Sequence, residues 1–341
     1  MIRFFCLSIS IASLLFQPAR GENTDGDGAQ LLVKSRARVI VDNDFGGDPD
    51  GLFQLAHQLL SPSVEVRGII GSHHYPKGFY GYAGSADHGV EMAKELLDVM
   101  KLTGKVPVFQ GANERLKDLS SPAYSEAAQF IVRESMRSDV SSPLYVVCGA
   151  GLTDLASAYL IEPKIAERIQ VIWIGGPEHE GLAVPPPGKP QVEYNLGMDV
   201  KAAQVVFNQS ALPIWQVPRN TYRQALVSYA ELQLKLGGSG KLGSYLLVRL
   251  QDLLQRAKGS LGEAYVLGDS PLVLLSAMQS SWESDPSSSS YVTMHALRIS
   301  DQGGYEKNPD GREIRVYTNL DTRMMFEDLY AKVARFDEKA R

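Results

Sequence analysis

Residues 39–51 read VIVDNDFGGDPDG, an apolar run followed at once by a group of aspartates. The first three residues are β-branched, which is typical of a strand buried on both faces of a sheet. Four aspartates then lie within nine residues, and like charges this close repel one another unless a cation lies between them. Oxygen ligands at this spacing suit calcium or magnesium rather than zinc. A solvated acidic turn is the alternative, but the position directly after an apolar strand favours a binding site.

Short apolar segments of the same kind recur along the chain, with helical patterns between them. The expected strands are residues 39–41, 64–70, 106–109, 144–147, 169–174 and 212–217. Apolar residues at helical spacing occur at residues 86–101, 125–136 and 200–207. This alternation predicts an α/β fold with an open, mostly parallel, Rossmann-like sheet and helices on both faces. Ligands of such sheets bind outside the carboxyl ends of the strands, which is where the aspartates lie.

The last third of the chain is expected to complete the same domain. Its patterns predict helices at 222–236 and 242–256, a loop at 285–290, strands at 292–299 and 313–317, and a closing helix at 322–336. No repeat and no linker divides the chain. We therefore expect a single domain from residue 37 to residue 341.

The N-terminal segment has the features of a secretory signal peptide. Arg3 precedes an apolar run at 4–16, and Ala19 and Gly21 are small residues at the two positions that a signal peptidase reads. We expect cleavage after Gly21, a flexible leader at 22–36, and export to a periplasm or out of the cell. The apolar run is too short for a comfortable membrane span, and no span is expected in the mature chain.

The charge balance restricts the class of ligand. The formal net charge is −5 and there is no long basic stretch. Proteins that bind nucleic-acid duplexes usually carry a concentrated positive patch, so duplex binding is not expected. A small neutral molecule fits better as the partner. The sequence leaves open whether the chain forms a homo-oligomer.

Five segments, in order and at comparable spacing, resemble the inosine–uridine-type nucleoside hydrolase family. They follow the family patterns Asp-x-Asp-x-Gly-x-Asp-Asp, Gly-x-Leu-Thr-Asn, Met-Gly-Gly, Glu-Phe-Asn with a following Asp-Pro-Glu-Ala-Ala, and His-Asp-Pro-Leu. In this chain they are residues 42–51, 151–155, 174–176, 193–203 and 268–272. The resemblance implies a nucleoside hydrolase-like fold.

The resemblance also implies calcium-dependent hydrolysis of the N-glycosidic bond of ribonucleosides, or of a related riboside, to free base and ribose. The implied Ca²⁺ ligands are Asp44, Asp50, the backbone carbonyl of Thr153, and Asp269. Asp44 would also activate a calcium-bound water as general base. Such a reaction passes through an oxocarbenium-like state that nearby carboxylates stabilise, and a bound cation can orient water and sugar together.

Ribose contacts are implied for Asp48, Glu193 and Asn195. Two departures from the family pattern bear on the chemistry. Pro49 separates Asp48 from Asp50, where the family has adjacent aspartates, so either residue could correspond to the pair.

Gly268 stands where many members carry a histidine that protonates the leaving base. The candidates for leaving-group or base contacts are then His73, His74 and Tyr265.

Two other functions compete with this interpretation. Gly268 favours a non-catalytic module that binds calcium and ribose without turnover. A phosphatase of the haloacid-dehalogenase type also begins with Asp-x-Asp after an apolar strand. That class normally has Thr or Val after the second aspartate, whereas this chain has Phe45. The segments at 193–195 and 269 also speak against the phosphatase.

Overall fold

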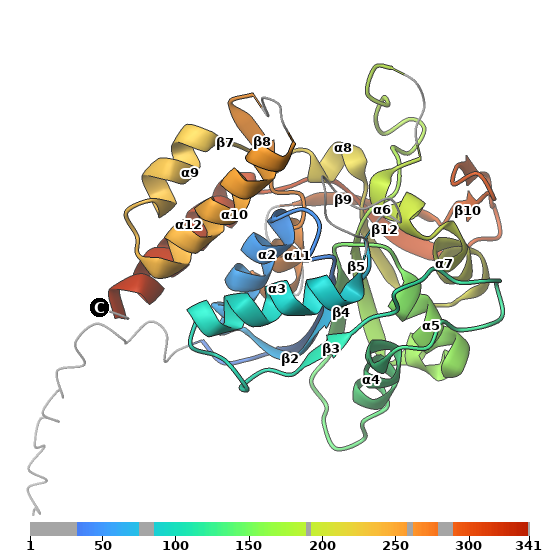
Figure 1. The fold of residues 1–341 in the computed structure, drawn as a ribbon. Helices are drawn as coiled ribbons and strands as arrows, with labels where there is room; N and C mark the ends of the chain where they lie inside the picture. The colour runs from blue at the N-terminus through green and yellow to red at the C-terminus, as the bar shows by residue number, and fades with distance from the viewer. Residues whose placement is uncertain (1–32, 75–84, 189–191, 258–261, 279–288, 340–341) are drawn as a thin grey trace, which may run out of the picture. The chain divides into compact units, whose positions relative to one another are not determined.

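The computed structural model describes residues 33–74, 85–188, 192–257, 262–278 and 289–339 (Figure 1). The expected signal peptide, most of the expected leader and most of the loop at 285–290 lie outside these ranges, so those expectations stay predictions. From Lys34 onward the described residues form one compact unit. No helix within the described ranges is long and apolar enough to cross a membrane.

An eight-stranded sheet runs through this unit in the order β3-β2-β1-β4-β5-β6-β12-β9. Its strands are β1 (Ala37–Asn43), β2 (Val64–Gly71), β3 (Val108–Gln110), β4 (Leu144–Cys148), β5 (Ile169–Ile174), β6 (Ile214–Val217), β12 (Glu313–Asn319) and β9 (Ser290–His295). Every neighbouring pair is parallel except β12 and β9. The predicted open, mostly parallel sheet is therefore confirmed, with one antiparallel strand at its edge.

Helices cover both faces of the sheet, as Figure 1 shows. One group is α2 (Asp50–Leu59), α3 (Ala86–Val99), α9 (Tyr229–Leu236), α10 (Lys241–Arg256), α11 (Pro271–Ala277) and α12 (Thr322–Lys339). The other is α4 (Glu126–Ser135), α5 (Thr153–Ile161), the 3₁₀ helix Pro163–Glu167, α6 (Tyr194–Met198), α7 (Val200–Gln204) and the π-helix Val205–Gln209. The helix expected at 322–336 is thus confirmed.

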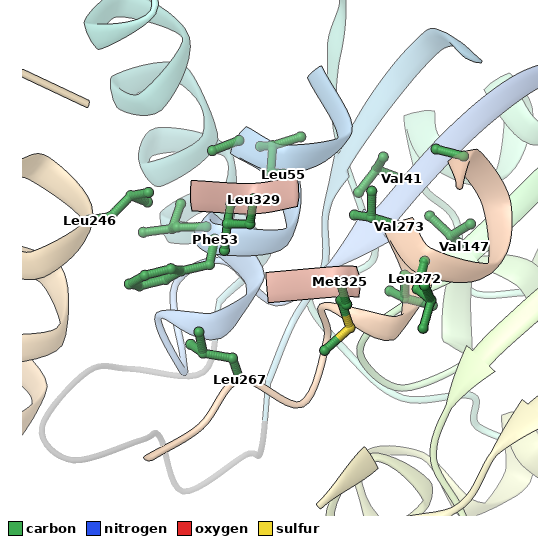
Figure 2. Close-up of a cluster of buried hydrophobic side chains, with 14 of the residues drawn as sticks. Val41, Phe53, Leu55, Val147, Leu246, Leu267, Leu272, Val273, Met325 and Leu329 are labelled. Atoms are coloured by element: carbon green, nitrogen blue, oxygen red, sulfur yellow. The ribbon is translucent and has the colours of Figure 1, made fainter. Parts of the chain in front are cut away.

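Two hydrophobic cores result, one on each face, and the residues of β1 alternate between them. Val39 and Val41 belong to the core under α2 and α11, whereas Ile40 belongs to the core under α4 and α5. Figure 2 shows the first core, in which Val41 lies near Val273 of α11. A strand buried on both faces needs an unbroken apolar run, which is what the sequence at 39–41 provides.

Three expected elements differ in the structure, namely the helix at 222–236, the strand at 292–299 and the helix at 200–207. The helix expected at 222–236 is divided into α8 (Arg219–Tyr222), β7 (Leu226–Ser228) and α9. The strand β7 pairs with β8 (Ala264–Val266). Because β8 lies far from β7 along the chain, no local sequence pattern predicts this pairing. The strand expected at 292–299 is also divided, into β9 and β10 (Arg298–Ile299), and β10 pairs with β11 (Tyr305–Glu306).

The helix expected at 200–207 passes into a π-helix after Gln204. The guanidinium of Arg312 donates hydrogen bonds to the carbonyls of Val206 and Phe207 at 2.8 and 2.9 Å. These carbonyls lie at the end of the helix and lack partners in a regular α-helical ladder. The change of helical type therefore depends on a residue about 100 positions away.

Candidate active site

The aspartate segment forms a tight turn between β1 and α2. The backbone N–H of Gly47 donates to the Asp44 carbonyl at 2.7 Å. Pro49 precedes the first helical residue with φ −69°, a value that its ring imposes in any context. Helix α2 therefore begins at Asp50, and the carboxylate of Asp50 lies at the positive end of the helix dipole.

A cavity of about 230 Å³ opens at the carboxyl ends of the central strands. Its walls contain Asp44, Asp48, Asp50, Gly149, Ile174, Glu193, Tyr194, Asn195, Tyr222, Val266, Gly268 and Asp269. Six of the residues that the sequence analysis named for metal or ribose contacts are therefore brought together. This is the location that the parallel sheet predicts for a ligand.

Three of the carboxylates in the cavity are almost inaccessible to solvent. Asp44, Asp50 and Asp269 are each exposed by less than a tenth of their surface. Burial raises the pKa of Asp44 and Asp50 well above the usual range, and the charge of Asp269 raises both further. Burial likewise raises the pKa of Asp269 to about 7 and that of Asp48 to about 6. A bound cation would offset this desolvation and repulsion.

Protein donors already hold several of these oxygens. The amide of Asn43 donates to Oδ2 of Asp269 at 2.9 Å, and the N–H of Gly51 donates to Oδ1 of Asp50 at 3.0 Å. The hydroxyl of Tyr265 donates to Oδ1 of Asp48. Within the described ranges, no three acidic, histidine or cysteine side chains form a closed group of metal ligands.

The segment at 193–195 also lines the cavity. The carboxylate of Glu193 caps the N-terminus of α6, where it accepts hydrogen bonds from the backbone N–H groups of Asn195 and Leu196. The side-chain amide of Asn195 donates to the carbonyls of Gly149 and Ile174 at 2.9 and 2.7 Å. Both predicted ribose contacts therefore line the cavity, on a rigid support.

Thr153 does not line the cavity. Its carbonyl, which the resemblance assigned to the metal, accepts the Ser157 hydroxyl at 2.7 Å inside α5, and its own hydroxyl donates to Asp199 at 2.8 Å. The backbone at Gly149 lies at the cavity instead, directly after β4. Its position at the carboxyl end of a central strand is the signal that could have identified it from the sequence.

The two histidines proposed as leaving-group donors also lie outside the cavity walls. His73 is buried; its Nε2 lies 3.0 Å from the Thr153 hydroxyl, and its Nδ1 lies 3.1 Å from the His74 carbonyl. His74 is fully buried. The third candidate, Tyr265, bonds to Asp48 and so reaches the edge of the site. The structure thus does not place an imidazole where the family histidine would be.

Gly268 has little free space around it. A Cβ atom at this position would lie 3.3 Å from Oδ2 of Asp50 and 3.4 Å from Cδ2 of Tyr222. The ring of Tyr222 therefore fills part of the volume that a larger residue at 268 would need. Sequence reasoning did not identify Tyr222, because nothing in its local pattern marks it as part of the site.

Comparisons with known proteins agree with this geometry. The family model described as inosine-uridine preferring nucleoside hydrolase matches residues 39–327. The enzyme of that name from Crithidia fasciculata is 34% identical over an alignment 206 positions long, which covers 53% of this chain and 58% of that enzyme. The one from Leishmania major is 36% identical over 51% of this chain and 57% of its own length. The matched part thus spans little more than half of these relatives.

Solved structures show the same fold. A purine-preferring ribonucleoside hydrolase from Gardnerella vaginalis superimposes with a TM-score of 0.66 at 17% identity, over 89% of this chain and 99% of that one. A plant nucleoside hydrolase gives a TM-score of 0.62 at 19% identity, over 88% and 99% of the two chains. The family model covers most of the described unit, and every residue that lines the cavity lies within the matched range. The chain belongs to the inosine-uridine preferring nucleoside hydrolase family.

Proposed function

We propose that this protein hydrolyses the N-glycosidic bond of ribonucleosides or related ribosides, in a calcium-dependent reaction that releases free base and ribose. One observation carries the proposal: Asp44, Asp50 and Asp269, all buried, line the same cavity as Glu193 and Asn195. Family membership supports it. Carboxylates beside a sugar-sized cavity match the needs of a reaction with an oxocarbenium-like state.

The donor set of the cavity fits a hard divalent cation. Its side chains offer oxygens, and among the described lining residues there is no cysteine or histidine. Asp44, Asp50 and Asp269 would hold calcium. When bound, calcium lowers the pKa of water and offsets the repulsion between the carboxylates.

The residues of the chain then have distinct tasks. Asp44 accepts a proton from the attacking water, whose oxygen bonds to C1′ of the ribosyl group while the electrons of the C–N bond leave with the base. Asp44 must be ionised to accept this proton, and bound calcium would favour the ionised form by offsetting the burial and the Asp269 charge that raise the pKa of Asp44. Asp48, Glu193 and Asn195 are lining residues that position the sugar in the cavity.

Protonation of the leaving base is the missing part. Gly268 cannot donate a proton, and neither His73 nor His74 is among the lining residues. The third candidate, Tyr265, already donates its hydroxyl hydrogen to Asp48. We infer that the base leaves as an anion that takes its proton from solvent. This favours ribosides whose leaving group is stable as an anion over inosine or uridine.

We also propose that the chain is exported, as its first 21 residues suggest. Mass spectrometry of protein recovered from the producing cells tests this directly. A mature N-terminus at Glu22 supports export, and an intact Met1 in protein retained inside the cells contradicts it.

A substrate panel tests the activity. Nucleosides and nitrophenyl ribosides are incubated with the protein in calcium or in chelator, and released base and ribose are measured by chromatography. We expect release in calcium and none in chelator. Calorimetric binding of a riboside without release would favour the non-catalytic module. Hydrolysis of nitrophenyl phosphate instead of the riboside would favour the phosphatase.

A further inference from the structure

The carboxylate of Glu193 already has four hydrogen-bond donors. Its Oε2 accepts the backbone N–H groups of Gly176 at 2.7 Å and Leu196 at 3.0 Å. Its Oε1 accepts the N–H of Asn195 at 3.2 Å and the hydroxyl of Tyr222 at 2.9 Å. A carboxylate has about four lone-pair sites, so these donors fill its acceptor capacity. A ribose hydroxyl would find no lone pair on Glu193 without displacing one of them.

Tyr222 is bonded through its hydroxyl to Glu193, and both residues line the cavity. Tyr222 is the last residue of α8, and its ring lies beside Gly268. The short helix is held in place because the Thr221 hydroxyl donates to the Tyr317 carbonyl at 2.6 Å. Burial and the adjacent Glu193 charge raise the pKa of Tyr222, so the phenol stays protonated and keeps donating to Glu193.

We propose that Tyr222, rather than Glu193, accepts the hydrogen bond from a ribose hydroxyl. The substrate hydroxyl donates to Tyr222 Oη, and the Tyr222 hydroxyl in turn donates to Glu193. A phenol that donates its one hydrogen still has acceptor capacity for an incoming hydroxyl. Tyr222 is thereby a specificity-determining residue, and Glu193 is a positioning residue that orients it. This inference rests on the proposed function, because it assumes that a riboside occupies the cavity.

The arrangement distinguishes two effects of Tyr222→Phe. The ring stays, so the wall beside Gly268 is kept, but the acceptor for the substrate is lost. If the Tyr222 hydroxyl only helped to hold the cavity wall in place, its loss would weaken every riboside by the same factor. If Tyr222 accepts a hydrogen bond from one particular hydroxyl, the substitution should not change kcat/KM for a riboside that lacks this hydroxyl.

The test is a cycle between protein and substrate. We compare kcat/KM of the wild type and Tyr222→Phe for a nitrophenyl riboside and for its 2′-deoxy, 3′-deoxy and 5′-deoxy forms. We expect a loss of about 3- to 10-fold for the parent, the range of one net hydrogen bond. For one of the deoxy forms, the kcat/KM of the wild type divided by that of the variant should be close to one. Tyr229→Phe is the matched control, because its hydroxyl accepts a hydrogen bond from Gln251 outside the cavity.

Equal losses for the parent and all three deoxy forms would overturn the inference, as would no loss for any of them. If the wild type turns over no riboside, the proposed hydrolysis fails. The same cycle, carried out on calorimetric dissociation constants in calcium, then still decides the role of Tyr222. An absence of riboside binding to the wild type would overturn both proposals.

Discussion

Asp269→Asn should stabilise the protein in chelator and remove most of its response to calcium. Burial raises the pKa of Asp269 from 3.8 to about 7, so the folded state resists its ionisation. At about 1.4 kcal/mol per pKa unit, this rise corresponds to at most about 4 kcal/mol of the free energy of unfolding. The neighbouring carboxylates share this effect, so the measured gain should fall below that limit. Asparagine can still accept the hydrogen bond from Asn43.

The pH dependence has a definite sign. Because the folded pKa of Asp269 is raised, the folded state binds more protons than the unfolded state between pH 3.8 and about 7. The stability of the wild type in chelator should therefore fall as the pH rises through this window. The Asp269→Asn variant should lack this part of the fall, and the difference between the two should be largest above pH 7.

Urea unfolding of both proteins, in chelator and in calcium, measures these effects. Calcium should raise the free energy of unfolding of the wild type and raise that of Asp269→Asn much less. Asp118→Asn is a suitable control: this carboxyl is exposed, lies outside the cavity and has a pKa lowered to about 2 by hydrogen bonds. The reasoning is refuted if Asp269→Asn is less stable than the wild type in chelator above pH 7 and gains the same stability from calcium.

Four further outcomes are expected. Asp44→Ala should abolish turnover while its circular dichroism stays that of the wild type, because both the base and a metal ligand are lost; a near-normal rate would reject its role. A nitrophenyl riboside should be hydrolysed about 10²- to 10⁴-fold faster than inosine or uridine in initial-rate assays, whereas equal rates would show that an acid is present. Gly268→His alone should not raise the rate on inosine, because the Tyr222 ring and Asp50 crowd the new side chain; a marked gain would contradict the packing. His73→Gln should lower the melting temperature but leave the ratio of the nitrophenyl to the inosine rate unchanged; a changed ratio would place His73 in the reaction.

The central part of the fold could be predicted from the sequence because its signals are local. The run at 39–41 is apolar without interruption, as a strand between two cores requires, and the aspartates follow it directly. Once the sheet is taken as parallel, the carboxyl ends of its strands meet at one edge. The grouping of Asp44, Asp269 and Glu193 follows from that geometry and from the order of the matched segments.

The remaining features depend on contacts that local patterns do not contain. The pairing of β7 with β8 joins residues 226–228 to 264–266 across two helices. A motif match at Thr153 identifies the segment, but Gly149 rather than Thr153 is among the residues that line the cavity. Likewise, the bond from Tyr222 to Glu193 joins the last residue of α8 to the residue that caps α6.

A crystal structure of the protein soaked with calcium is the most direct test of the account. We expect one ion at the cavity, with oxygens of Asp44, Asp50 and Asp269 at roughly 2.3–2.6 Å from it. The carboxylate of Asp269 should point toward the ion, whether it keeps or loses the hydrogen bond from Asn43. An ion bound elsewhere, or an Asp269 carboxylate that points away from the ion, would contradict the proposed site.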